Sequence, residues 1–151
     1  MSKRFIDTGL YDDPWFMDLS KDGKIIWIYM TTRCNHAGII EINRKLVKMQ
    51  TDVENIDTVI KELGNRILTV SKDLYFIPKF ITFQYPNFPQ SAVKQQKSAI
   101  ELLEKIGKVN PEIQRVTQQL LNCYGNGNEY DNGNGGGVRG GKKHEDLIFP
   151  R

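Results

Sequence analysis

Few residues in this chain could support catalysis, a disulfide framework or a membrane span. Its 151 residues include two cysteines, Cys34 and Cys123, and two histidines, His36 and His144. Two cysteines so far apart favour free thiols over a disulfide framework, and two histidines leave a serine or cysteine triad few candidate bases. No apolar run approaches the roughly 20 residues needed to span a bilayer. We therefore expect a cytoplasmic protein with no membrane partner.

The residue patterns also lack the signatures of metal and cofactor sites. Cys34 and His36 lie close together, but zinc needs about four ligands and no second pair follows. The glycines between Gly133 and Gly141 have neither a predicted strand before them nor a predicted helix after them, unlike a phosphate-cradling loop. We expect no enzyme activity, no catalytic residue, no metal and no cofactor.

Neither the composition nor the charge is extreme. The chain is 39% hydrophobic and 26% charged, with a net charge of +3, which fits one compact core and permits contact with a polyanion without requiring it. Beyond Asn122 the sequence turns to glycine and asparagine, which cannot bury enough surface to offset their ordering entropy. We predict a compact domain over 1–109, a further helix over 110–121, a disordered, flexible linker over 122–145 and a short apolar tail over 146–151.

Capping residues and apolar spacing predict several helices. The first is a short helix opened by Asp13 and Pro14, with apolar residues Trp15, Phe16 and Leu19. The second runs from Ser20 to about Cys34, with core positions Ile25, Ile28 and Tyr29, broadened by Trp27 and Met30. The third runs from Arg44 to about Gln50 after the cap Asn43, with Leu46, Val47 and Met49 facing inward.

Two more helices follow on the same grounds. One begins at the cap Asp52 or Asn55, ends at Gly64 and Asn65, and has Ile56, Val59, Ile60 and Leu63 on its apolar face. The last, an added carboxyl-terminal helix, runs from the cap Ser91 through Ile106 and stops at Gly107. The aromatic stretch over 79–89 between these two helices is expected to be extended.

The β-prone runs are short and widely separated. Ile67–Ser71 and Leu74–Ile77 predict a hairpin around Lys72 and Asp73, and Ile39–Ile42 predicts a further strand. A strand this short cannot stand alone, so we expect it to lie beside the hairpin as a third strand. The resulting order is helix, short strand, helix, helix and two-stranded wing, which predicts an α+β winged helix-turn-helix.

The same segments resemble a known family. KRFIDTGLYDDPWFMDLS, CNHAGIIEIN and the hairpin followed by YFIPKFITFQYPN are similar to the amino-terminal domain of phage replication-initiation proteins, the replisome organisers related to the primosome protein DnaD. The likeness covers about Ser2 to Gly107. It implies a winged-helix domain that acts at a phage origin through DNA binding, self-association and contacts with host or phage replication proteins, such as the helicase or its loader. Longer members carry a further segment, whereas this chain ends at LIFPR soon after the linker.

DNA binding needs donors that reach base edges and cations that meet phosphates. The predicted recognition helix fits this poorly, because Asp52–Glu62 contains four acids against Lys61. Contacts led by the surrounding cations are therefore expected, with double-stranded DNA as the partner and single-stranded DNA as a second form. The candidate residues are Lys3, Arg4, Arg44, Lys45, Lys48, Asn55, Thr58, Lys61, Arg66, Lys72 and Lys79.

A second interpretation needs no direct contact with DNA. The winged helix could instead serve assembly of a primosome-like complex, meeting another copy of the chain or a replication protein through its acidic helix and the aromatic segment after the wing. The candidate residues are Phe83, Tyr85 and Phe88, because an exposed aromatic surface favours a partner. The basic helix over 44–50 also has a simpler explanation, because three basic residues on one helix more often form a solvated face than a binding patch.

Overall fold

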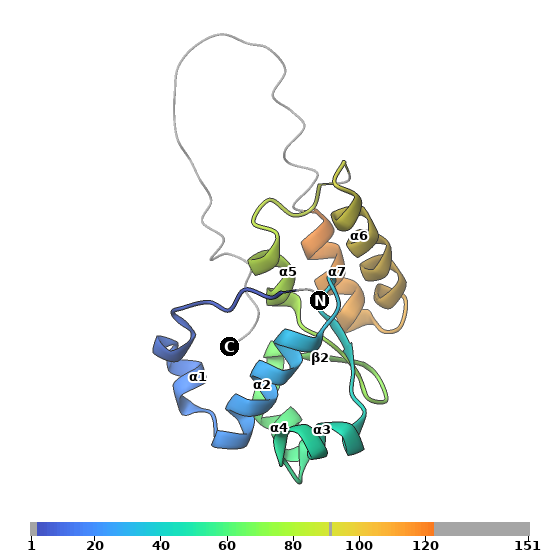
Figure 1. The fold of residues 1–151 in the computed structure, drawn as a ribbon. Coiled ribbons are helices and arrows are strands. Elements are labelled where there is room, and N and C mark those ends of the chain that lie inside the picture. The colour runs from blue at the N-terminus through green and yellow to red at the C-terminus, as the bar shows by residue number, and fades with distance from the viewer. Residues whose placement is uncertain (1–2, 91, 123–151) are drawn as a thin grey trace, which may run out of the picture. The chain divides into compact units, whose positions relative to one another are not determined.

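The computed structural model describes residues 3–90 and 92–122. These residues divide into two compact units, one ending at Pro86 and the other beginning at Asn87 (Figure 1). The predicted linker and tail, with Cys123 and His144, lie outside the described residues. So does Ser91, the predicted cap of the last helix.

Most of the first unit is helical. It contains η1 (Leu10–Asp12), α1 (Pro14–Asp18), α2 (Lys21–Arg33), α3 (Arg44–Thr51), α4 (Ile56–Leu63), η2 (Gly64–Arg66) and α5 (Pro78–Gln84). The predicted caps Asp13, Asn43 and Asn55 are confirmed, because their side chains accept hydrogen bonds from the backbone at the starts of α1, α3 and α4. Ser20, the predicted start of the second helix, caps α2 in the same way. Asp52 instead ends α3 in the left-handed conformation, with φ +62°.

The three strands form one antiparallel sheet in the order β1-β3-β2. They are β1 (Ile39–Glu41), β2 (Leu68–Ser71) and β3 (Leu74–Phe76). β1 pairs with β3 so that Ile39 lies opposite Phe76, and the hairpin β2–β3 turns at Lys72 and Asp73. The prediction that the short early strand joins the later hairpin is therefore confirmed, and the first unit has an α+β fold.

The turn between α2 and β1 fixes the position of β1. The Asn35 side-chain oxygen accepts hydrogen bonds from the Ala37 and Ile39 amides, at 2.9 and 3.0 Å. Gly38 adopts φ +73° and its carbonyl accepts a 2.8 Å hydrogen bond from the Ile77 amide. A Cβ atom at Gly38 would lie 2.7 Å from the Ile77 oxygen, so only glycine fits this approach.

One hydrophobic core joins the helices of the first unit to the sheet. It includes Phe16 of α1, Met30 of α2, Val47 of α3 and Leu63 of α4, together with residues that lie in or beside the three strands. The deepest positions of α2 are Ile26, Trp27 and Met30, whereas the predicted core residues Ile25, Ile28 and Tyr29 are only half-buried. Trp27 and Met30, which broaden the predicted stripe, are thus confirmed as core residues, while Ile25, Ile28 and Tyr29 pack against the core from its edge.

Two sequence-based expectations for the first unit were wrong. The stretch after Pro78 is helical, because proline fits a first helical turn and α5 buries Phe80 and Ile81 on its inner face. In α3 only Val47 is buried; Leu46 and Met49, predicted to face inward, are 41% and 74% exposed. With 3.6 residues per turn, Leu46 and Met49 point about 100° and 160° away from Val47, so one side of the helix cannot bury all three.

The second unit is a pair of packed helices, α6 (Lys94–Gly107) and α7 (Pro111–Asn122). The α7 helix confirms the further helix predicted over 110–121. The α6 helix begins three residues after the predicted cap, at Lys94, and Val93 provides no side-chain cap. A Cβ atom at Gly107 would lie 2.6 Å from the Thr117 hydroxyl, so the two helices approach closely there.

The Gly38 turn can be tested by substitution. Gly38→Ala should lower the free energy of unfolding by more than Gly64→Ala does. Both glycines have positive φ, whose cost for alanine is roughly 1–3 kcal/mol, but a Cβ at Gly64 meets nothing within 4 Å. Urea unfolding followed by circular dichroism measures both. Equal losses would contradict a requirement for close approach at Gly38.

Candidate nucleic-acid interface

Arg44 joins three elements at the turn end of the hairpin. Its Nη1 and Nη2 atoms donate to the two carboxylate oxygens of Asp57, both at 2.9 Å, and its Nε donates to Asp73 Oδ1 at 2.6 Å. Arg44 opens α3, Asp57 lies in the first turn of α4 and Asp73 lies in the β2–β3 turn. We call these three residues the Arg44 clamp. It holds the starts of α3 and α4 against the tip of the hairpin.

The clamp neutralises the cation that was expected to lead DNA contact. Its hydrogen bonds with Asp57 and Asp73 raise the pKa of Arg44 above the usual range, and the hydrogen bond from Arg44 lowers the pKa of Asp57. A forked guanidinium held by two carboxylates has few donors left for a phosphate. The geometry thus gives Arg44 a structural role.

The other predicted cations of α3 and α4 divide into paired and unpaired groups. Lys48 forms an ion pair with Glu54 at 2.6 Å. Lys45, Lys61 and Lys72 are exposed, and none forms an ion pair within residues 3–90 and 92–122. Of the predicted basic group Arg44, Lys45 and Lys48, only Lys45 therefore keeps an uncompensated charge.

The acids of α4 are largely accounted for in the same way. Asp57 belongs to the clamp and Glu54 pairs with Lys48, while Glu62 accepts hydrogen bonds from the Ser20 amide and, at 2.7 Å, from its hydroxyl. Over 44–63 the chain carries as many Lys and Arg as Asp and Glu. The acidity that argues against DNA contact is therefore balanced locally, and the segment 44–63, which includes Asp52 and Glu54 between the two helices, has no net charge.

Two polar candidates on α4 differ in availability. Asn55 caps the helix, because its side-chain oxygen accepts a 3.1 Å hydrogen bond from the Thr58 amide. The Thr58 side chain is exposed beside it. Thr58 and Lys61 are thus the side chains on the outer face of α4 that could meet a base edge or a phosphate.

The predicted basic group near the wing is split between the two ends of the hairpin. Lys72 lies in the turn, whereas Arg66 precedes β2 and Lys79 follows β3. The four residues of β2 separate these ends by about 14 Å. At the base, the Arg66 guanidinium lies 4.5 Å from the centre of the Trp15 ring. One surface patch does not contain all three cations.

The amino-terminal cations also occupy separate positions. Arg4 donates a 2.6 Å hydrogen bond to the Cys34 carbonyl and lies 5.3 Å from the centre of the Phe80 ring. Lys3 is exposed. Arg4 therefore ties the chain start to the end of α2 and to α5.

The three aromatic residues proposed as a partner surface do not lie on an extended segment. Phe83 is part of α5 and is 45% exposed, Tyr85 is buried, and Phe88 is half-buried beyond the boundary between the units. Burial raises the pKa of the Tyr85 phenol. Phe83 alone has the exposure that the interpretation requires.

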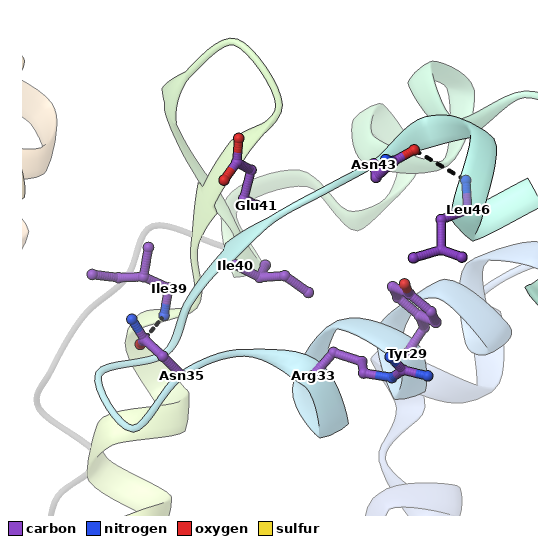
Figure 2. Close-up of a pocket in the computed structure, with 8 residues that line it drawn as sticks. All are labelled: Tyr29, Arg33, Asn35, Ile39, Ile40, Glu41, Asn43 and Leu46. Atoms are coloured by element: carbon purple, nitrogen blue, oxygen red, sulfur yellow. Dashed lines mark hydrogen bonds between the residues drawn. The ribbon is translucent and has the colours of Figure 1, made fainter.

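An open groove of about 310 Å³ lies between the end of α2, β1 and the start of α3 (Figure 2). Leu46 lies over the Tyr29 ring, and the Arg33 guanidinium lies 5.4 Å from the centre of that ring. The Tyr29 hydroxyl donates to Gln50 at 3.1 Å. The sequence pattern does not predict this groove, because apolar spacing places Tyr29 and Leu46 in the core. Its other lining residues are Asn35, Ile39, Ile40, Glu41 and Asn43.

Cys34 and His36 do not form a metal site in the structure. Cys34 is buried, and burial raises the pKa of its thiol to about 11, far from the range of a thiolate ligand. Within residues 3–90 and 92–122, no group of three or more His, Cys, Asp or Glu could hold a metal ion. In the same ranges no helix has the length and apolar character needed to cross a membrane.

Comparison of the chain with protein-family models, with curated proteins and with solved structures finds no significant match.

The Arg44 clamp should make stability depend on pH. Because the pKa of Asp57 is depressed in the folded protein, its contribution is present above the ordinary value of 3.8 and is lost as pH falls through the depressed value. Wild type should therefore exceed Arg44→Gln in urea midpoint above about pH 5, and the difference should shrink at lower pH.

Circular dichroism across this pH range measures the difference. Arg44→Lys is the matched control, since it keeps the charge but loses the two-pronged contact and should give an intermediate midpoint. A difference that stays constant with pH would show that Asp57 does not depend on Arg44.

Proposed function

We propose that this chain is the winged-helix DNA-binding module of a phage or prophage replication initiator, acting in origin recognition or helicase loading. The pairing of β1 with β3 carries the proposal, because it gathers α2, α3, α4 and the hairpin around one core. This gathering supports the proposal of a helix-turn-helix with a wing. The replication role rests on the sequence resemblance.

In this proposal α4 is the reading helix and the hairpin turn is the wing tip. The Arg44 clamp sets the angle between them, so that both meet one duplex face. Lys45 of α3, Lys61 of α4 and Lys72 of the turn contact phosphates, and Thr58 faces the bases. Few base-reading side chains are available, so backbone recognition dominates.

The local charge balance limits the strength of this interface. With three phosphate contacts, the logarithm of the binding constant should fall with the logarithm of salt concentration with a slope of about −3. Such a module binds DNA modestly by itself. Self-association or a replication protein would then supply further affinity through simultaneous contacts.

The triple substitution Lys45→Ala, Lys61→Ala and Lys72→Ala should remove most duplex binding at low salt, because it removes the unpaired cations at the turn end. Fluorescence anisotropy with a labelled duplex over a salt series measures this. The matched control is Lys94→Ala, Lys97→Ala and Lys105→Ala on α6, which removes the same charge. Equal losses in both triples would reject this interface.

A protein-assembly module is the second candidate. It is favoured by Leu46 and Met49, which α3 exposes beside the groove at Tyr29 and Arg33. Aromatic residues, methionine and arginine are enriched at protein interfaces. The partner would be another copy of the chain or a replication protein such as the helicase or its loader.

The assembly candidate predicts that Met49→Glu abolishes any concentration-dependent rise in mass, because a charge would enter the apolar contact. Analytical ultracentrifugation over a concentration series measures this. Met17→Glu is the control, since Met17 is also exposed but lies on α1. Assembly that survives Met49→Glu would exclude this face of α3.

A further inference from the structure

The Arg66 side chain lies at the base of the hairpin, and its N–H donors have no acceptor within the described residues. Its guanidinium lies 4.5 Å from the centre of the Trp15 ring, and it makes no hydrogen bond or ion pair within the described part of the chain. A guanidinium that lies over an aromatic face uses no N–H donor in that contact, so its donors can still bind an acceptor. Arg66 therefore differs from Arg44, whose donors are taken by two carboxylates.

Lys79 lies at the same end of the hairpin. Leu68 at the start of β2 pairs with Phe76 at the end of β3. Arg66, which precedes β2, and Lys79, which follows β3, therefore lie at the same end of the hairpin. Burial and the Arg66 charge lower the pKa of the Lys79 ammonium. The nearby acid, Asp13, accepts a hydrogen bond from the Trp15 amide as the cap of α1 and forms no ion pair with Arg66 or Lys79.

Two neighbouring cations without a paired acid repel one another, and an anion between them would relieve that repulsion. The forked guanidinium of Arg66 can hold two oxygens of one group, while the Lys79 ammonium acts as a mobile point charge. Regularly spaced phosphates suit such a pair, because one can meet Arg66 while the same or the next meets Lys79. Trp15 is half-buried, so part of its ring faces solvent beside them.

We propose that Arg66 and Lys79 bind the phosphate backbone of a nucleic-acid strand at the hairpin base, a site separate from the surface formed by α4 and the hairpin turn. The length of β2 keeps the two sites about 14 Å apart. The strand is either a single-stranded arm or the flank of a bound duplex, since both present the same phosphodiester. The site does not require that α4 read a duplex.

Substitution of both residues tests the site. Arg66→Ala with Lys79→Ala should weaken binding of a single-stranded oligonucleotide by about tenfold at low salt, and the salt slope should become shallower by about 0.7 for each lost phosphate contact. Arg33→Ala with Lys21→Ala is the matched control, because it removes another ring-stacked arginine and another exposed lysine. Fluorescence anisotropy of the full chain measures both variants.

The probes distinguish the source of the phosphate. Loss on the single strand, and on a duplex with a single-stranded overhang but not on the blunt duplex, assigns the site to a single-stranded arm. Loss on a long blunt duplex but not on a short one assigns it to duplex flanks. Either result supports the site. Because the Lys45, Lys61 and Lys72 triple should retain single-strand binding, failure of the duplex interface and failure of this site give different results.

Two further measurements guard against a folding artefact. Lys79→Ala alone leaves the Arg66–Trp15 contact in place and should still weaken binding. In the wild-type chain, the Trp15 indole N–H resonance should shift on titration with the oligonucleotide. Losses no greater than those of the Arg33 and Lys21 control on every one of these probes would overturn the proposal. So would equally strong competition by polyglutamate, which would indicate an acidic protein partner.

Discussion

The pairing of β1 with β3 is the constraint on which the rest of the first unit depends. The Ile42 amide donates to the Asp73 carbonyl at 2.7 Å, and the Ile77 amide donates to the Gly38 carbonyl at 2.8 Å, so the strand is held at both ends. A two-stranded hairpin of this length is marginal alone. The third strand stabilises it and brings the end of α2 and the start of α3 to the same sheet, which lets three helices share a core.

The same register decides where charge is available. Because β1 ends beside the hairpin turn, Arg44 meets Asp73 there and also reaches Asp57 on α4. Arg44 therefore stabilises the fold, and the segment 44–63 has no net charge. Within the described residues, cations without an ion pair lie on α3, on α4 and at the turn, in Lys45, Lys61 and Lys72, and at the opposite end of the hairpin, in Arg66. The hairpin thus separates the cation at its turn from the cations at its base, which favours two distinct contacts over one broad basic surface.

Several residues show why part of the fold could be predicted from the sequence. The caps Asp13, Asn43 and Asn55 act locally, since a cap needs only the next few amides, and all three are confirmed. The β1–β3 pairing was also inferable, because so short an apolar strand needs a partner. The helix α5 could not be inferred in this way, because its aromatic residues suggest an extended chain. Burial of Phe80 and Ile81 overrides that preference.

The sequence by itself determined the order of helices and strands up to β3, the caps and the two-residue turn of the hairpin. These depend on neighbours along the chain and on apolar spacing. Only the tertiary structure decided which charged side chains form ion pairs and that Leu46 and Met49 face outward. It also decided that the Arg66 guanidinium lies over the Trp15 ring, where no described residue accepts from its N–H donors. Such properties depend on residues far apart in the sequence, which a local pattern does not record.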